Sequence, residues 1–199
     1  MYTRSSHQPR SSADVLQIIR ENMFGTLVTC GEGGMMATHL PFLIDDAATT
    51  LFAHMARANA QSAMLNGEAL VMFQGPHAYI SPSWYEDRAT APTWDYIAVH
   101  CYGTPRLHSE DEARGNIERL IAIVEATSQR PWAMDELSEE SIRALLRNVV
   151  SFEIALTRIE GKFKLNQGEK KERNQAALTQ LEQSGAGELA SWMRRYNDL

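Results

Sequence analysis

Residues 52–61 read FAHMARANAQ, a short strand pattern that runs into the first turn of a helix. Arg57 stands at the junction, where the first backbone N–H groups of a helix have no internal partner and attract anions. A guanidinium beside those groups predicts a phosphate site, because its N–H fork binds phosphate oxygens in pairs. The alternative is a solvated surface residue, which is the commoner role of an Arg at a helix start.

Short strand patterns surround this stretch at regular intervals. Turn sequences such as Glu32-Gly33-Gly34 and Asp45-Asp46 separate them, and residues 58–66 are helical by composition. Strands spaced in this way around one short helix predict a small antiparallel barrel, and argue against a parallel α/β sheet. The six expected strands are residues 25–30, 35–44, 51–54, 69–74, 96–102 and 152–159.

Helical patterns precede, interrupt and follow the barrel. An amphipathic segment at 12–23 is capped by Ser11 or Ser12, and the sequence Ser109-Glu110-Asp111-Glu112 is a capping box that opens a second helix. A third helix starts near Ser138, and two more fall near 172–183 and 187–196. We therefore expect a single domain over residues 1–199, with a helical insertion at about 109–148 and C-terminal helices at about 170–197.

The composition is that of an ordinary globular protein, with 199 residues, 44% hydrophobic and 22% charged. No apolar run approaches the roughly 20 residues that a membrane helix needs, and the N-terminus lacks a signal-peptide core, so we expect a cytoplasmic protein without membrane contact. Cys30 and Cys101 lie in apolar segments and are expected to be reduced core residues. The net charge of −6 disfavours a protein that grips the DNA backbone.

Two segments dense in Pro and aromatic residues follow the fourth strand, at 73–85 and 91–96. The first is expected to be an irregular loop, ordered by packing against something flat. Trp84 and Trp94 offer stacking area, so one interpretation is a wall beside a planar ligand, and the alternative is aromatic packing at a subunit interface. Both hold if the ligand lies between subunits.

Residues 161–167 are expected to follow the last strand. Lys162 and Lys164 are two positions apart, so an extended backbone points them the same way and makes a local positive patch. Asn166 and Gln167 can donate or accept hydrogen bonds at the edge of a heterocycle. The alternative is a charged exit from a strand.

Several kinds of site are disfavoured by the spacing of the candidate residues. The histidines show no metal-binding motif, although His39 and His54 fall in neighbouring expected strands and could converge. No Gly-x-Ser-x-Gly elbow is present, and the glycine-rich signatures of nucleotide sites are absent too. We expect neither a catalytic side chain nor a metal ligand.

The motifs together resemble PaiB-type proteins, which are described as FMN-binding negative transcriptional regulators. The resemblance spans nearly the whole chain and implies a flavin-binding split barrel related to pyridoxamine-phosphate oxidases. It also implies a homodimer whose FMN lies in a cleft shared by two subunits. The motifs that carry it are His39-Leu40-Pro41-Phe42, residues 54–61, residues 75–85, Pro92-Thr93-Trp94, residues 99–103 and residues 161–167.

The resemblance also implies which residues hold FMN. Arg57 would bind the phosphate with Asn59 and Gln61 beside it, while Thr38, His39 and His54 would line the ribityl chain and the ring. The partner subunit would contribute its aromatic loops and the late basic segment, through Trp84, Trp94, Lys162, Lys164 and Asn166.

Two departures from the oxidase relatives bear on the ligand. Ala58 follows Arg57 where those relatives often carry Lys, which removes one charge from the phosphate site. The late Arg-rich substrate segment of the oxidases is missing, which argues against pyridoxal chemistry.

Three functions stay open at this point. The first is a regulator whose FMN state controls transcription; the chain shows no helix-turn-helix signature, so DNA contact would rest on Lys170, Lys171, Arg173, Arg194 and Arg195. The second is a flavin reductase or oxidoreductase, in which FMN carries hydride or electrons. The third is haem binding through His39 or His54, as in some split-barrel relatives.

Overall fold

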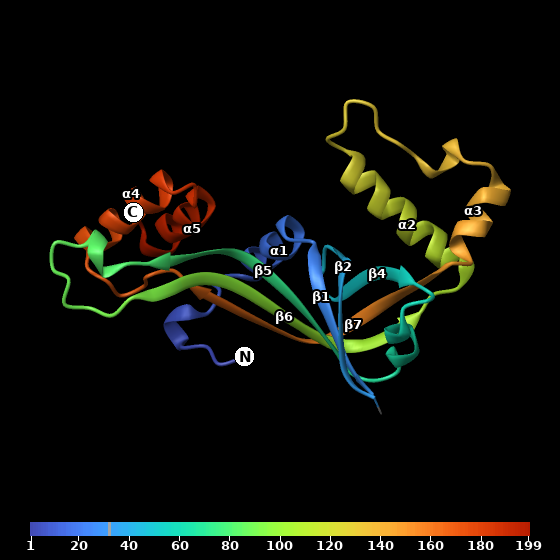
Figure 1. Cartoon of the computed structure of the whole chain (residues 1–199), viewed down its shortest axis with the longest axis horizontal. Helices are drawn as coiled ribbons and strands as arrows, with labels where there is room; N and C mark the ends of the chain where they lie inside the picture. The colour runs from blue at the N-terminus through green and yellow to red at the C-terminus, as the bar shows by residue number, and fades with distance from the viewer. Residues whose placement is uncertain (32) are drawn as a thin grey trace. The chain divides into compact units, whose positions relative to one another are not determined.

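A seven-stranded sheet dominates the computed structural model, which describes every residue except Glu32 (Figure 1). The predicted turn at Glu32-Gly33-Gly34 therefore lies partly outside the described residues. The sheet has the order β2-β1-β5-β6-β7-β4-β3. Its strands are β1 (Phe24–Gly31), β2 (Gly34–Pro41), β3 (Leu43–Ile44), β4 (Thr50–Ala56), β5 (Ala69–Ile80), β6 (Thr93–Leu107) and β7 (Val149–Lys164).

Helices make up the rest of this α+β fold. Each predicted helix at the chain ends and in the insertion is confirmed, including the reciprocal capping box between Ser109 and Glu112. None of the helices in the described part of the chain combines the length and apolar character that crossing a bilayer requires. The α-helices are α1 (Ser12–Glu21), α2 (Glu110–Glu125), α3 (Glu139–Leu146), α4 (Lys171–Gln183) and α5 (Gly187–Asn197), and the 3-10 helices are η1 (Ser5–His7), η2 (Ala60–Met64), η3 (Pro82–Trp84) and η4 (Met134–Glu136).

The chain divides into two compact units. Unit 1 comprises Met1–Asn22, Gln74–Val99 and Glu160–Leu199, and unit 2 comprises Met23–Phe73 and His100–Ile159. The long strands β5, β6 and β7 each contribute residues to both units.

Unit 2 holds the barrel-like part of the sheet. β1 pairs antiparallel with β2 and β5, and β4 pairs antiparallel with β3 and β7. β2, at one end of the order, also contacts β4, the strand next to the other end, so the sheet curls toward closure. Leu27, Leu51 and Phe152 are fully buried between these strands. Outside them α2 and α3 share a smaller cluster of buried side chains around Ile142.

Unit 1 is built around the C-terminal helices, with α4 and α5 packed against each other (Figure 1). Ile18 and Ile19 of α1 are fully buried, as the amphipathic pattern at 12–23 predicts. The Phe163 and Tyr196 rings stack with centroids 5.3 Å apart. Buried aromatic pairs of this kind stabilise a core beyond the area that they bury.

Strand lengths are the main correction to the predicted fold. Residues 73–80, expected to be an irregular loop, continue β5, and residues 161–164, expected to follow the last strand, belong to β7. Gly75 explains the first error: a Cβ at this position would lie 3.2 Å from Ile97 Cβ, so glycine here serves close packing of strands rather than a turn.

The sheet also has seven strands where six were expected. The predicted strand at 35–44 divides at Phe42, because the residues before it pair with β1 as β2 and the residues after it pair with β4 as β3. The predicted helix at 58–66 is the shorter 3-10 helix η2.

Cys30 corrects the prediction that both cysteines are core residues. Cys101 is buried, but Cys30 is exposed because the inward positions of β1 are those of Gly25, Leu27 and Thr29. The two-residue period of a strand places Cys30 on the opposite face.

Candidate functional site

Arg57 follows the last residue of β4, as the sequence predicts, and its guanidinium is anchored to the backbone. Its Nε donates to Arg147 O at 2.8 Å and its Nη2 donates to Val149 O at 2.7 Å. The backbone N–H of Arg57 donates to Asn148 O at 2.8 Å. Among the described residues, Nη1 has no partner, so one end of a rigidly held guanidinium remains available.

A cavity of about 190 Å³ in unit 2, here called the Arg57 cavity, opens at this guanidinium. Arg147 lines it too, and no carboxylate in the described part of the chain pairs with either Arg. Since a water takes up about 30 Å³, the cavity has room for about six waters or a phosphate group. The Arg57 guanidinium, which has no acid partner among the described residues, favours an anion, and Glu110 is the acidic residue of the lining. His108, Ser109 and Ser151 supply further polar groups.

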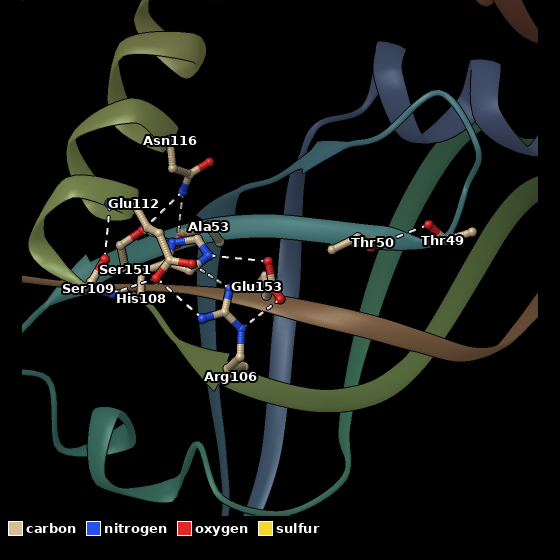
Figure 2. A network of polar contacts seen from close by, with 10 residues as sticks. All are labelled: Thr49, Thr50, Ala53, Arg106, His108, Ser109, Glu112, Asn116, Ser151 and Glu153. Atoms are coloured by element: carbon tan, nitrogen blue, oxygen red, sulfur yellow. Dashed lines mark hydrogen bonds and ion pairs between the residues drawn. The ribbon is translucent and has the colours of Figure 1, made fainter.

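The wall of the Arg57 cavity is a buried polar network that ties α2 to the sheet (Figure 2). Asn116 Nδ2 donates to Ser151 Oγ at 3.1 Å and to Ala53 O at 3.3 Å, and His108 Nδ1 lies 2.9 Å from Ser151 Oγ. Ser151 Oγ itself donates to Ala53 O at 3.3 Å. Ser151 therefore joins β4, β7 and the helix that covers them.

The outer edge of the network carries the charged groups (Figure 2). Arg106 Nε donates to Glu153 Oε1 at 2.8 Å, and its Nη2 donates to Glu112 Oε1 at 2.8 Å. These bonds from Arg106 are the main cause that lowers the pKa of both carboxyl groups. Glu112 also completes the capping box of α2, so the start of the helix is fixed to β6 and β7.

Replacing Ser151 by Ala is expected to destabilise the protein by about 1–3 kcal/mol, because Asn116 and His108 lose a buried hydrogen-bond partner. Urea unfolding measures the change. Ser128→Ala is the matched control, since Ser128 is exposed and its backbone N–H, not its side chain, forms the hydrogen bond that it makes with the described residues. Equal midpoints for the two variants would show that the network does not hold α2 in place.

Three of the residues predicted to surround the phosphate and ring lie together in unit 2. Asn59 Nδ2 donates to Thr38 Oγ1 at 3.0 Å, and Asn59 Oδ1 accepts from the Gln61 N–H at 3.0 Å. Gln61 is fully buried and its Nε2 donates to Leu27 O, Thr29 Oγ1 and Met36 O. Gln61 thus fastens η2 to the β1–β2 hairpin.

The two candidate histidines differ in their surroundings. His39 is exposed on β2, and its ring forms an edge-type contact with that of Phe24 at a centroid distance of 6.1 Å. His54 is half-buried on β4, where burial lowers its pKa, and its Nδ1 is buried without a hydrogen-bond partner among the described residues. A neutral imidazole with a free ring nitrogen is suited to a ligand that offers a hydrogen bond.

The remaining predicted site residues lie in unit 1. Trp94 is 55% exposed, and its ring lies 6.1 Å from that of Tyr79 and 6.2 Å from that of His77. This exposed aromatic cluster includes a residue that the sequence analysis did not single out, Tyr79, which β5 brings to the same face. Trp84 lies in η3.

The two lysines of β7 are already engaged within the chain. Lys162 Nζ lies 5.2 Å from the centroid of the Tyr96 ring. Lys164 Nζ donates to Thr93 Oγ1 at 2.5 Å, to Trp94 O at 2.5 Å and to Asp95 Oδ1 at 3.1 Å, which accounts for its three N–H donors. Asn166 has a left-handed backbone with φ of 61° and donates to Asn174 Oδ1 at 2.8 Å.

Asp95 is completely buried beside Lys164, and burial raises the pKa of its carboxyl to about 6, with Lys164 opposing the shift. A folded-state pKa above the unfolded value of about 4 means that the folded protein binds this proton more tightly. The contribution of Asp95 to stability is therefore greatest below about pH 4 and is lost as the pH rises through about 6.

The pH dependence of stability tests this shift through Asp95→Asn, whose amide does not titrate. A shift of two pKa units corresponds to about 3 kcal/mol. We expect the stability of the parent protein relative to the variant to fall by up to this amount between about pH 4 and pH 7. A difference in unfolding free energy that stays constant over this range would contradict the shift.

The model of the family described as "Putative FMN-binding domain" matches residues 1–158. The chain belongs to this family. A flavin is therefore its cofactor, and FMN is the flavin that the family description names.

One relative is similar to this chain in sequence, and two solved structures are similar to it in fold. It is 34% identical over 186 residues to the protease synthase and sporulation protein PAI 2 of Bacillus subtilis, with 92% of this chain and 89% of the relative covered. The FAD and heme binding protein of Mycobacterium smegmatis matches at a TM-score of 0.62 and 14% identity, over 86% of this chain and 80% of that one. The flavocytochrome Anf3 of Azotobacter vinelandii matches at a TM-score of 0.61 and 12% identity, over 83% of this chain and 73% of that one. At these identities the two structures show the fold, which is the predicted flavin-binding split barrel.

Proposed function

We propose that the chain is a cytoplasmic homodimer that binds FMN in a cleft shared by its two subunits and acts as a negative transcriptional regulator. The division of the flavin residues between the two units carries this proposal. One set lies in unit 2, namely Thr38, His39, His54, Arg57, Asn59 and Gln61, and the other in unit 1, namely Trp84, Trp94, Lys162, Lys164 and Asn166. Each unit thus offers half of a site, one with an anion pocket and one with an exposed aromatic face.

The unit 2 half fits the phosphate end of FMN. Arg57 Nη1 is unpartnered among the described residues while Nε and Nη2 hold the group in place, so little side-chain entropy is lost on binding. Arg147 adds a second guanidinium in the same cavity. This pair replaces the Arg-Lys dipeptide that the oxidase relatives often carry. Close to Arg57 in the sequence, His54 Nδ1 and Gln61 Oε1 are buried without a partner among the described residues, so both atoms can form a hydrogen bond with a ligand.

The unit 1 half fits the ring system. Trp94 and Tyr79 are about half exposed and present aromatic area that a planar heterocycle can stack on. We propose that Lys164 acts here through Asp95 and Trp94 and fixes their backbone and side chains, because its own donors are already used. When bound, FMN supplies hydride or electron transfer, and the protein groups bind and orient it.

The regulatory part of the proposal rests on the relative from Bacillus subtilis, whose name links it to protease synthesis and sporulation. Of the five C-terminal cations that could contact DNA, three are paired with acids of the chain, whereas Lys170 and Lys171 have no acid partner among the described residues. Arg173 pairs with Glu169 at 2.9 Å, Arg194 pairs with Glu182, and Arg195 pairs with Asp14. The charge of these three arginines is therefore largely neutralised within the chain, so direct DNA contact would rest on Lys170 and Lys171.

A gel-shift titration on DNA selected from a random pool tests the regulatory role, with FMN-loaded and FMN-free protein side by side. The proposal predicts a sequence preference that changes with FMN loading. Equal, non-specific affinity for every DNA in both states would remove the direct regulatory role and leave the flavin site intact.

The neutralised C-terminal arginines favour a second candidate, a flavin reductase or oxidoreductase, because such an enzyme needs no DNA surface. Anaerobic addition of NADH or NADPH to the FMN-loaded protein tests it. Bleaching of the visible flavin bands supports the enzyme, and an unchanged spectrum with both nucleotides removes this candidate.

A further inference from the structure

A second polar cavity lies in unit 1, and two of the residues predicted to touch FMN, Lys164 and Asn166, line it. It has a volume of about 240 Å³, and Asp95 and Lys164 lie in its wall with Arg4, His7 and Tyr85. At about 30 Å³ per water, it has room for about eight waters or a ligand of similar volume. We call it the Asp95 cavity.

The carboxylate of Asp95 is only half satisfied. Lys164 Nζ donates to Oδ1 at 3.1 Å, whereas Oδ2 is buried without a partner among the described residues. A buried carboxylate oxygen without a hydrogen bond is costly, and native proteins usually satisfy such an atom with a ligand or an ordered water. Because Lys164 fixes Oδ1, the position of Oδ2 is fixed as well.

Arg4 is the cation of this cavity that has no acid partner in the described part of the chain. The other charged groups are already paired: Lys164 binds Asp95, and Glu169 binds Arg173 at 2.9 Å. His7 has a lowered pKa because of burial and the cations Lys164, Lys162 and Arg4, so it lines the cavity as a neutral group at pH 7. The cavity thus offers one free positive charge and one free buried acceptor.

We propose that the Asp95 cavity binds a small carboxylate that carries a neutral O–H or N–H group, and that this ligand is distinct from the flavin. Arg4 holds the ligand carboxylate through its guanidinium fork, and Asp95 Oδ2 accepts the hydrogen bond from the neutral donor. Ile80 and Ala91 provide apolar contact for the carbon skeleton. A ligand ammonium group is disfavoured by the neighbouring Lys164 and Arg4.

Calorimetric titration with glycolate and acetate at about pH 7 tests the hydrogen bond between the ligand and Asp95 Oδ2, since the two probes differ only by the hydroxyl group. We expect one-to-one binding of glycolate, about tenfold or more tighter than acetate, because only glycolate can donate to Asp95 Oδ2. Asp95→Asn should abolish the preference, since its amide pairs differently at that position. Arg4→Ala should weaken both probes by a similar factor, and Arg88→Ala, an exposed Arg of the same unit outside the cavity, should weaken neither.

Two outcomes would overturn the proposal. One is equal affinity for glycolate and acetate, or no saturable binding of either up to about 10 mM, in the parent protein. The other is competitive displacement of glycolate by FMN, which would make the cavity part of the flavin site. Near-ultraviolet circular dichroism shows whether Asp95→Asn folds. If it does not, the affinities of the parent protein and of Arg4→Ala for glycolate and acetate still test the proposal.

Discussion

Arg57→Ala is expected to weaken FMN binding by about 1.5–3 kcal/mol, or roughly 10- to 150-fold, while riboflavin affinity stays nearly unchanged. FMN and riboflavin differ by the phosphate alone. Nη1 of Arg57 has no partner among the described residues, so we expect this nitrogen to bind the phosphate. Fluorescence titration of both flavins measures the effect. Equal losses for FMN and riboflavin would show that Arg57 acts through the ring site or through folding.

Arg147→Ala is the matched variant for this experiment. Arg57 also donates to two backbone carbonyls, so its removal leaves Arg147 O and Val149 O without this donor and lowers stability. Arg147 lines the same cavity, and it takes part in those bonds through its backbone carbonyl and not through its side chain. We therefore expect Arg147→Ala to weaken FMN binding with little change in the unfolding midpoint.

Gly103→Ala is expected to destabilise the fold by about 3 kcal/mol or more, since overpacking between two paired strands cannot relax locally. Gly103 lies in β6, and a Cβ there would overlap Ala155 O of the neighbouring β7 and lie 2.8 Å from Ile154 Cγ2. The backbone of one strand would have to shift. Urea unfolding of the purified variant, or its failure to accumulate in folded form, measures the effect.

Gly115→Ala is the control of opposite sign. Among the described residues, a Cβ on Gly115 lies within 4 Å of no atom outside its chain neighbours and the backbone of its own helix. The residue lies inside α2, where Ala is favoured over Gly by about 0.5–1 kcal/mol. The two glycine variants should therefore move the unfolding midpoint in opposite directions. A Gly103→Ala protein as stable as its parent would contradict the close approach of β6 and β7.

The helices could be predicted from sequence because their signals are local. Ser109 and Glu112 are three positions apart and cap α2 as expected, and the apolar spacing at 12–23 gives the buried face of α1. Strand ends could not be predicted in the same way. Gly75 and Pro76 are typical of a loop, but the strands packed around them extend β5 to Ile80.

The candidate site shows the same limit. Arg57 could be located from its neighbours in the sequence, but the carbonyl that holds its Nε comes from Arg147, 90 positions later. Lys162 and Lys164 were expected to form a free positive patch. Asp95, 69 positions away from Lys164, binds that lysine instead, and no local spacing indicates such a pair.

A mixed-dimer FMN titration tests the shared cleft most directly. Arg57→Ala subunits, altered in unit 2, are combined with Trp94→Ala subunits, altered in unit 1, and differently tagged mixed dimers are purified. A cleft shared by two subunits predicts one tight FMN per mixed dimer, with the affinity of the parent protein, because one of its two sites has both halves intact. Weakened FMN binding at every site of the mixed dimer, or a parent protein that stays monomeric, would contradict the account.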